Sequence, residues 1–142
     1  MPYLIDHIDA IARQKQRAVL FVEFHPQDTE DDSPLSYLNY DYEHDARRQA
    51  FMDWLDERSI GWCPCAPIAD ECGFESYLGQ VYIDLRMDES DPTYCELRDH
   101  LEHPDGSIRE DNVRFYVLKL EVAMQNAHHD EPGFWERWSE TF

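Results

Sequence analysis

The stretch AVLFVEF, residues 18–24, is a short apolar run rich in β-forming side chains. Such a run predicts a buried strand, and it ends at His25-Pro26 because proline has no backbone N–H to donate. Apolar residues then recur at helical spacing over residues 43–59, which predicts an amphipathic helix that ends near Gly61. A strand followed by a helix therefore begins the pattern that decides the fold.

Two further strands are predicted next. Residues 60–68 (IGWCPCAPI) have strand-like side chains, but Pro64 and Pro67 remove donors from the hydrogen-bond ladder, so we expect an edge strand. Residues 80–85 (QVYIDL) alternate Val, Ile and Leu with Tyr and Asp. This period of two is typical of a half-buried strand, with Tyr82 on the face opposite the apolar residues.

The last elements complete a recognisable order. Asp91-Pro92 predicts the start of a helix that runs through Glu102, and the apolar residues 113 to about 122 predict a final strand, although its second half also suits a helix. The order strand, helix, strand, strand, helix, strand is that of the ferredoxin-like split βαβ. We therefore expect residues 1–142 to form a single α+β domain of this type (βαββαβ, antiparallel).

Two additions flank this unit. Apolar residues at helical spacing predict an N-terminal helix that ends near Arg17, and residues 127–142 form a Trp-rich C-terminal helical tail. Both internal helices cover one sheet face, so Phe21, Tyr82 and either Phe115 or Tyr116 should lie on the other. We expect the added helix and tail to cover this aromatic face in a monomer, or a second copy to cover it in a homodimer.

Charge is distributed unevenly along the chain. The formal net charge is -19, and no Lys or Arg occurs between Arg17 and Arg47. Such a surface repels phosphates, so direct nucleic-acid binding is not expected. The carboxylates of this stretch concentrate in a predicted acidic loop, residues 26–42, which also carries tyrosines of the kind that anchor protein interfaces.

Two hypotheses explain the acidic loop. It could bind a basic protein partner, or it could be a hydrated segment that only aids solubility. A calcium loop is not expected, because the glycine at the sixth position and the glutamate at the twelfth are absent. The residues assigned to partner binding are Asp28, Glu30, Asp31, Asp32, Tyr37, Tyr40, Asp41 and Tyr42.

The candidate metal ligands are two small groups. Cys63 and Cys65 lie at alternate positions of a predicted strand, so both thiols should point to one side, and Cys72, Cys95 or a histidine could complete a zinc site. His128 and His129 precede two acidic residues and could bind a metal if they lie in a loop. The alternatives are buried, apolar cysteines and a polar linker before the tail.

Enzyme signatures are missing from the sequence. It contains no glycine-rich phosphate loop, no G-x-S-x-G nucleophile and no H-E-x-x-H zinc helix. No apolar run reaches the length of a membrane span, and the N-terminal residues carry charges that do not suit a signal peptide, so we expect a cytoplasmic protein. The leading hypothesis is a non-enzymatic inhibitor, immunity factor or DNA mimic, and the alternative is a metal-binding protein or metal-dependent enzyme.

Overall fold

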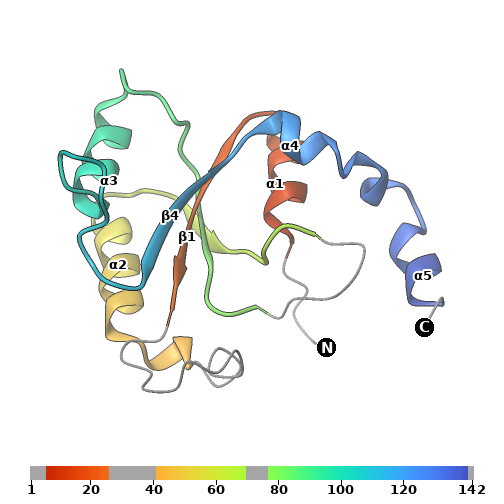
Figure 1. Cartoon of the computed structure of the whole chain (residues 1–142), viewed down its shortest axis with the longest axis horizontal. Helices are drawn as coiled ribbons and strands as arrows, with labels where there is room; N and C mark the ends of the chain where they lie inside the picture. Colours follow the sequence, from red (N-terminus) through yellow and green to blue (C-terminus); the bar gives the residue numbers. More distant parts are fainter. Residues whose placement is uncertain (1–5, 26–40, 70–76, 141–142) are drawn as a thin grey trace.

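The structure is a computed structural model that describes residues 6–25, 41–69 and 77–140. It has an α+β architecture in which strands and helices are interspersed along the chain (Figure 1). The elements in chain order are α1 (Ile8–Lys15), β1 (Val19–Phe24), η2 (Tyr42–His44), α2 (Ala46–Glu57), β2 (Trp62–Pro64), β3 (Val81–Ile83), α3 (Pro92–Leu101), β4 (Val113–Leu118), α4 (Leu120–Met124), η3 (Ala127–Asp130) and α5 (Phe134–Ser139).

The sheet has four strands in the order β2-β3-β1-β4, and every neighbouring pair is antiparallel. The central strand β1 pairs along its whole length with β4, so that Phe21 lies opposite Tyr116. On its other side β1 pairs with β3, which places Phe21 opposite Tyr82 as well. The prediction that the proline-bearing segment forms an edge strand is confirmed, because β2 pairs only with β3 within the described sheet.

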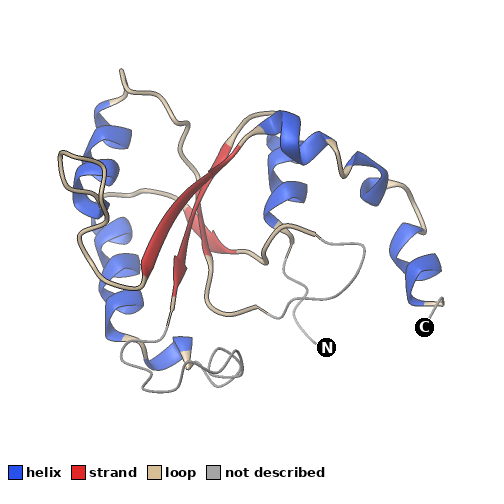
Figure 2. Cartoon of the chain, in the orientation of Figure 1, coloured by secondary structure: helices blue, strands red, loops and turns tan. Residues whose placement is uncertain are grey.

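One face of the sheet packs against α2 and α3, which lie on the same side of it (Figure 2). Leu20 and Val22 of β1 meet Leu55 of α2 and Leu97 of α3 in this layer. All four side chains are fully buried. Both helices begin at a capping aspartate, Asp45 in α2 and Asp91 in α3, as expected for helices that follow a loop.

The other face is covered within the chain by α1 and α4. Phe21 and Tyr82 are buried there with Ile8, Ile11 and Ala123. The predicted covering by the N-terminal helix is thus confirmed, but its companion is α4, whereas α5 extends beyond it and contacts η3 (Figure 1). Because both faces are covered, Tyr82 is only 4% exposed, and the expectation of a half-buried third strand was wrong.

The final strand is shorter than predicted. It ends at Leu118, and after the extended residue Lys119 the chain turns into the helix α4. The prediction of a strand to about residue 122 was therefore wrong. The reason is tertiary, because the helical turn places Ala123 with no exposed surface against α1, and a continued strand would leave that face of the sheet uncovered.

A buried carboxylate ties α1 to distant parts of the chain. Asp9 is fully buried, and its Oδ1 accepts a hydrogen bond from the backbone N–H of Ala69 at 3.2 Å. Its Oδ2 accepts from Arg13 at 3.1 Å and from Asn126 at 2.9 Å. Burial alone would raise the pKa of Asp9, but the hydrogen bonds from Asn126, Ala69 and Arg13 outweigh it and hold that pKa below 3.8.

Arg13 extends this buried network toward the C-terminal part of the chain. Its guanidinium binds both oxygens of Asp130, with distances of 2.7 Å and 2.9 Å, and donates to the carbonyl of Ala123 at 2.9 Å. A bidentate pair of this kind fixes orientation as well as distance. The network therefore fixes α4 and η3 onto α1, and with them the second covered face of the sheet.

None of the helices in the described part of the chain combines the length and the apolarity that crossing a bilayer requires.

Candidate functional site

The acidic segment joins the folded unit at the start of α2, where Arg47 holds three parts of the chain together. Its guanidinium pairs with Asp45 at 2.7 Å and donates to the carbonyls of His25 at 2.6 Å and Asp111 at 2.9 Å. The side chain of Arg47 is only 12% exposed. The charge of Arg47 is therefore paired with Asp45, and its N–H groups join the end of β1 to the residues before β4.

Arg48 also points inward and anchors Tyr42. It donates to the Gly79 carbonyl at 2.9 Å and to the Tyr77 hydroxyl at 2.8 Å. Its guanidinium lies 5.2 Å from the centre of the Tyr42 ring, and that ring meets Tyr77 edge to face at 4.9 Å. Tyr42, predicted as a partner contact, is thus half-buried against the folded unit and secures the end of the acidic segment.

Carboxylates dominate what this region presents to solvent. In the sequence, Arg47 and Arg48 are the only cations between Arg17 and Arg58. Both point inward, so no Lys or Arg in the described residues of this segment faces outward. The exposed carboxylates of η2, α2 and the residue before η2 are Asp41, Glu43, Asp53, Asp56 and Glu57.

Most residues predicted to bind a partner lie outside the described residues. Asp41 is one of those that the structure describes. It is exposed and accepts a hydrogen bond from the ring of His44. The predicted residues outside the described ranges are Asp28, Glu30, Asp31, Asp32, Tyr37 and Tyr40.

The two cysteines of β2 and its end have different environments. Cys63 is exposed, whereas Cys65 has no exposed surface and lies among the apolar side chains under α1. Burial, followed by the charge of Asp6, raises the pKa of Cys63, and burial raises that of Cys65 much further. Cys72 lies outside the described residues, and no group of three potential ligands occurs in the described part of the chain.

These environments predict different thiol reactivity. With iodoacetamide at pH 8, Cys63 should be alkylated more slowly than a cysteine in a short peptide, because its raised pKa leaves less thiolate. Cys65 should react only after unfolding, because it is fully buried. Peptide mapping by mass spectrometry with and without denaturant measures both rates, and rapid alkylation of Cys65 in the folded chain would contradict the structure.

The two candidate metal-binding histidines are adjacent, and His129 is buried in a packed aromatic cluster. His129 is 3% exposed, with its ring 4.6 Å from the Phe134 ring and 4.3 Å from that of His128. Asp130, the first of the two acidic residues that follow the pair, is bound by Arg13. The described residues therefore show His129 in a packing role.

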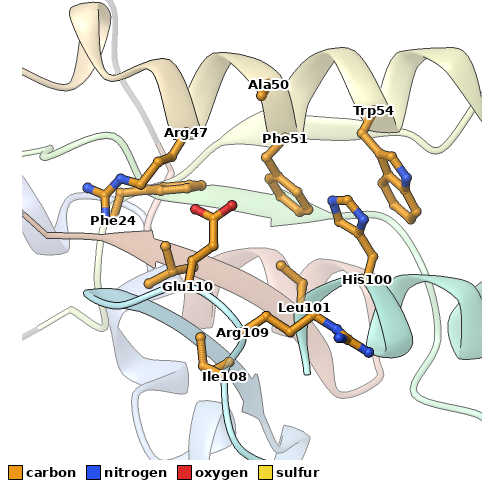
Figure 3. Close-up of a pocket in the computed structure, with 11 residues that line it drawn as sticks. Phe24, Arg47, Ala50, Phe51, Trp54, His100, Leu101, Ile108, Arg109 and Glu110 are labelled. Carbon is orange, nitrogen blue, oxygen red and sulfur yellow. The ribbon is translucent and has the colours of Figure 1, made fainter. Parts of the chain in front are cut away.

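A pocket that the sequence analysis missed lies between α2, the end of α3 and residues 108–110 (Figure 3). Its volume is about 230 Å³. Phe24, Phe51 and Trp54 form its aromatic part, and Glu110 lies across from them. Helical spacing marks Phe51 and Trp54 as apolar positions of one helix, but no sequence pattern brings Glu110 toward them.

The aromatic wall of this pocket is a continuous stack. The His100 ring lies 4.0 Å from the Trp54 ring at an interplanar angle of 12°. Phe51 is nearly parallel to both rings, and Arg58 covers Trp54 at 4.3 Å. Burial, followed by the charge of Arg58, lowers the pKa of His100 from its ordinary 6.5, so this ring is mainly neutral near pH 7.

Comparison with known proteins adds no relative: no family model, no curated protein and no solved structure matched the chain.

Proposed function

We propose that this chain binds a basic protein partner through the acidic loop, residues 26–42, and the adjoining surface of η2 and α2. The observation that carries the proposal is the inward orientation of Arg47 and Arg48. Their burial leaves Asp53, Asp56 and Glu57 as the charged groups that α2 exposes. Exposed carboxylates therefore occur both in the described end of the segment, at Asp41 and Glu43, and on the helix α2.

Rigid support matters for recognition. Charges on an ordered helix keep their spacing, whereas charges on a chain without fixed contacts lose entropy when they are ordered by binding. Tyr42 holds the end of the loop against Tyr77 and Arg48, which limits how far that end can move. Complementary charge then accelerates association and selects partners by sign.

The partner class follows from the same charge. A net charge of -19 disfavours nucleic acid as a direct ligand and favours a cationic protein surface. Proteins that bind DNA present such a surface, as do many toxins whose inhibitors are acidic. We therefore place the chain among inhibitors, immunity factors or DNA mimics, without a catalytic role.

Charge reversal of the loop tests this function. Replacing Asp28, Glu30, Asp31 and Asp32 together by lysine should weaken binding of the full chain to poly-L-lysine by at least about tenfold at low salt, since four attractive contacts become repulsive. Isothermal titration calorimetry measures the affinity. Raising the salt concentration should shrink the difference, because exposed charges are screened.

A matched control separates the loop from overall charge. Reversal of the exposed Asp6, Glu89, Glu121 and Glu140 changes the net charge equally at scattered places. If both quadruple variants lose affinity to the same extent, the loop has no special role and the proposal is wrong.

We also propose a ferredoxin-like topology, a cytoplasmic location and a monomeric state. The order β2-β3-β1-β4, with α2 and α3 on one face, supports a ferredoxin-like topology. The free thiols of Cys63, Cys65 and Cys95 support a reducing, cytoplasmic location. The coverage of both sheet faces within one chain favours a monomer over a face-to-face homodimer.

The alternative proposal is a zinc site at Cys63, Cys65 and Cys72. After burial, the charge of Cys63 is the next cause that raises the pKa of Cys65, so these two thiols are near enough to interact, which supports this alternative. The full burial of Cys65 among apolar side chains favours a packing role for that residue.

A further inference from the structure

We propose that the pocket between α2 and residues 108–110 binds the side chain of a lysine from the basic partner. This inference rests on the proposed function and names the chemistry of one contact in it. The pocket combines an aromatic wall with a carboxylate that points into it (Figure 3). That combination is the one that proteins use for alkylammonium groups, through cation–π attraction and an ion pair.

The sign of the bound charge follows from how the lining groups are used. Arg47 and Arg109 also line the pocket, but their guanidinium groups are bound elsewhere. Arg47 pairs with Asp45 and caps two backbone carbonyls, as described above. Arg109 donates its Nε–H to the carbonyl of Asp99 at 2.8 Å, and Figure 3 shows its guanidinium directed away from α2.

Glu110 is used differently. Figure 3 shows its carboxylate directed toward α2, between Phe24 and Phe51. Within the described part of the chain its carboxylate forms no ion pair or hydrogen bond, so its oxygens are available to a ligand. His100 adds little positive charge at neutral pH, because burial and Arg58 lower its pKa. The charged group that faces the aromatic side chains of the pocket is therefore the carboxylate of Glu110.

The shape favours a flexible aliphatic cation. The pocket volume of about 230 Å³ is several times the volume of about 30 Å³ that one water molecule occupies in the liquid, which leaves room for a four-carbon chain with its ammonium group. The stem of such a chain would lie on Phe24 and Phe51, both of which are nearly buried. Apolar contact with the stem and charge contact with the head would thus be made together.

Lysine suits these groups better than arginine. A guanidinium carries five N–H donors in a fixed plane and needs several acceptors, whereas an ammonium is a compact charge that one carboxylate and water can satisfy. Among the described residues that line this pocket, Glu110 is the one carboxylate. Trp54 is already in contact with the guanidinium of Arg58 at 4.3 Å and with the His100 ring at 4.0 Å, so we expect the ammonium to lie near Phe24, Phe51 and Glu110 and away from Arg58.

A small-molecule titration tests the inference on the full chain. The probe is n-butylammonium, which reproduces the lysine side chain, and its binding is followed by the indole N–H resonance of Trp54 in the ¹⁵N spectrum. The Trp54→Phe variant assigns that resonance. For a ligand with so few atoms we expect a dissociation constant in the millimolar range. Butyrate, of the same length and opposite charge, should bind at least about tenfold more weakly.

Glu110→Gln is the decisive variant. It keeps the size of the side chain and removes its charge, and because Glu110 is exposed the fold should be unaffected. We expect the affinity for butylammonium to fall about tenfold, since a bond to a charged group is lost. The matched control, Glu121→Gln, removes an exposed charge from α4 on the opposite layer and should leave the affinity unchanged.

Each other outcome overturns the inference. Absence of butylammonium binding, equal binding by Glu110→Gln and the unchanged chain, or tighter binding of butyrate would show that the pocket is not a lysine site. These results are independent of the loop test, because the butylammonium probe and the Glu110→Gln variant leave residues 28–32 unchanged. Loss of loop-dependent binding to poly-L-lysine, with butylammonium binding intact, would overturn the proposed function alone.

Discussion

Replacing Asp9 by alanine is expected to lower the free energy of unfolding by about 3 to 5 kcal/mol, the usual cost of removing one partner from a buried ion pair. Asp9 is fully buried and accepts hydrogen bonds from Arg13, Ala69 and Asn126, and all three of these bonds would be lost. Because the free energy of unfolding of a domain is only about 5 to 15 kcal/mol, a loss of this size removes a large part of the stability of the fold. Denaturant unfolding followed by circular dichroism measures the change.

Asp53→Ala is the matched control. Asp53 also lies in a helix and also bonds a side chain four residues away, Gln49, but it is exposed to solvent. Its removal should cost less than about 0.5 kcal/mol. If Asp9→Ala costs no more than Asp53→Ala, the buried network does not hold α1, α4 and η3 together.

The pH dependence of stability follows from the same group. Hydrogen bonds outweigh burial and hold the pKa of Asp9 in the folded chain below its ordinary 3.8, so the unfolded chain binds the proton more readily. The stability that Asp9 contributes is therefore complete above pH 3.8 and is lost as the pH falls through its folded-state pKa. In Asp9→Ala this part of the acid sensitivity should disappear.

Gly79→Ala should destabilise the chain by roughly 2 to 5 kcal/mol and release the anchor of the acidic loop. Gly79 has a φ of +92°, which L side chains rarely adopt and which costs about 1 to 2 kcal/mol. An added Cβ would also lie 2.6 Å from Cβ of Tyr42 and 3.1 Å from Nε of Arg48, and overpacking of this kind costs about 1 to 3 kcal/mol more. The ring contact between Tyr42 and Tyr77 should be disturbed first.

Gly106→Ala separates the backbone cost of a positive φ from the cost of overpacking. Gly106 has nearly the same φ, +89°, but an added Cβ would meet nothing within 4 Å. Its cost should therefore be the backbone part alone. Thermal unfolding of both variants gives the difference, and equal melting temperatures would show that Tyr42 yields to the added methyl group without loss.

The sequence predicted those elements whose signal is local. The apolar run of β1, the capping aspartate of α3 and the prolines near β2 each act within a few residues, and the α+β class and the edge position of β2 are confirmed. The end of β4 was missed because residues 119–124 suit either strand or helix. The choice between them depends on contact with α1, which no local pattern contains.

The candidate sites show the same division. Acidity of the loop is a property of composition and could be predicted, but the inward orientation of Arg47 and Arg48 depends on carbonyls of residues 25, 79 and 111. The pocket unites Phe24, Phe51 and Glu110 from three parts of the chain. Its charge is decided by where Arg109 and Glu110 point, and side-chain direction is not encoded in spacing.

The position of β1 at the centre of the sheet has a consequence for how the molecule forms. Both of its neighbours follow it at long distances along the chain, and β4 comes from the last third of the sequence. The contact order is therefore high, and loop closure must precede most of the stabilising strand pairing. During synthesis β1 leaves the ribosome long before β4, and the acidic residues that follow β1 in the sequence would discourage the nascent strand from pairing with other chains in that period.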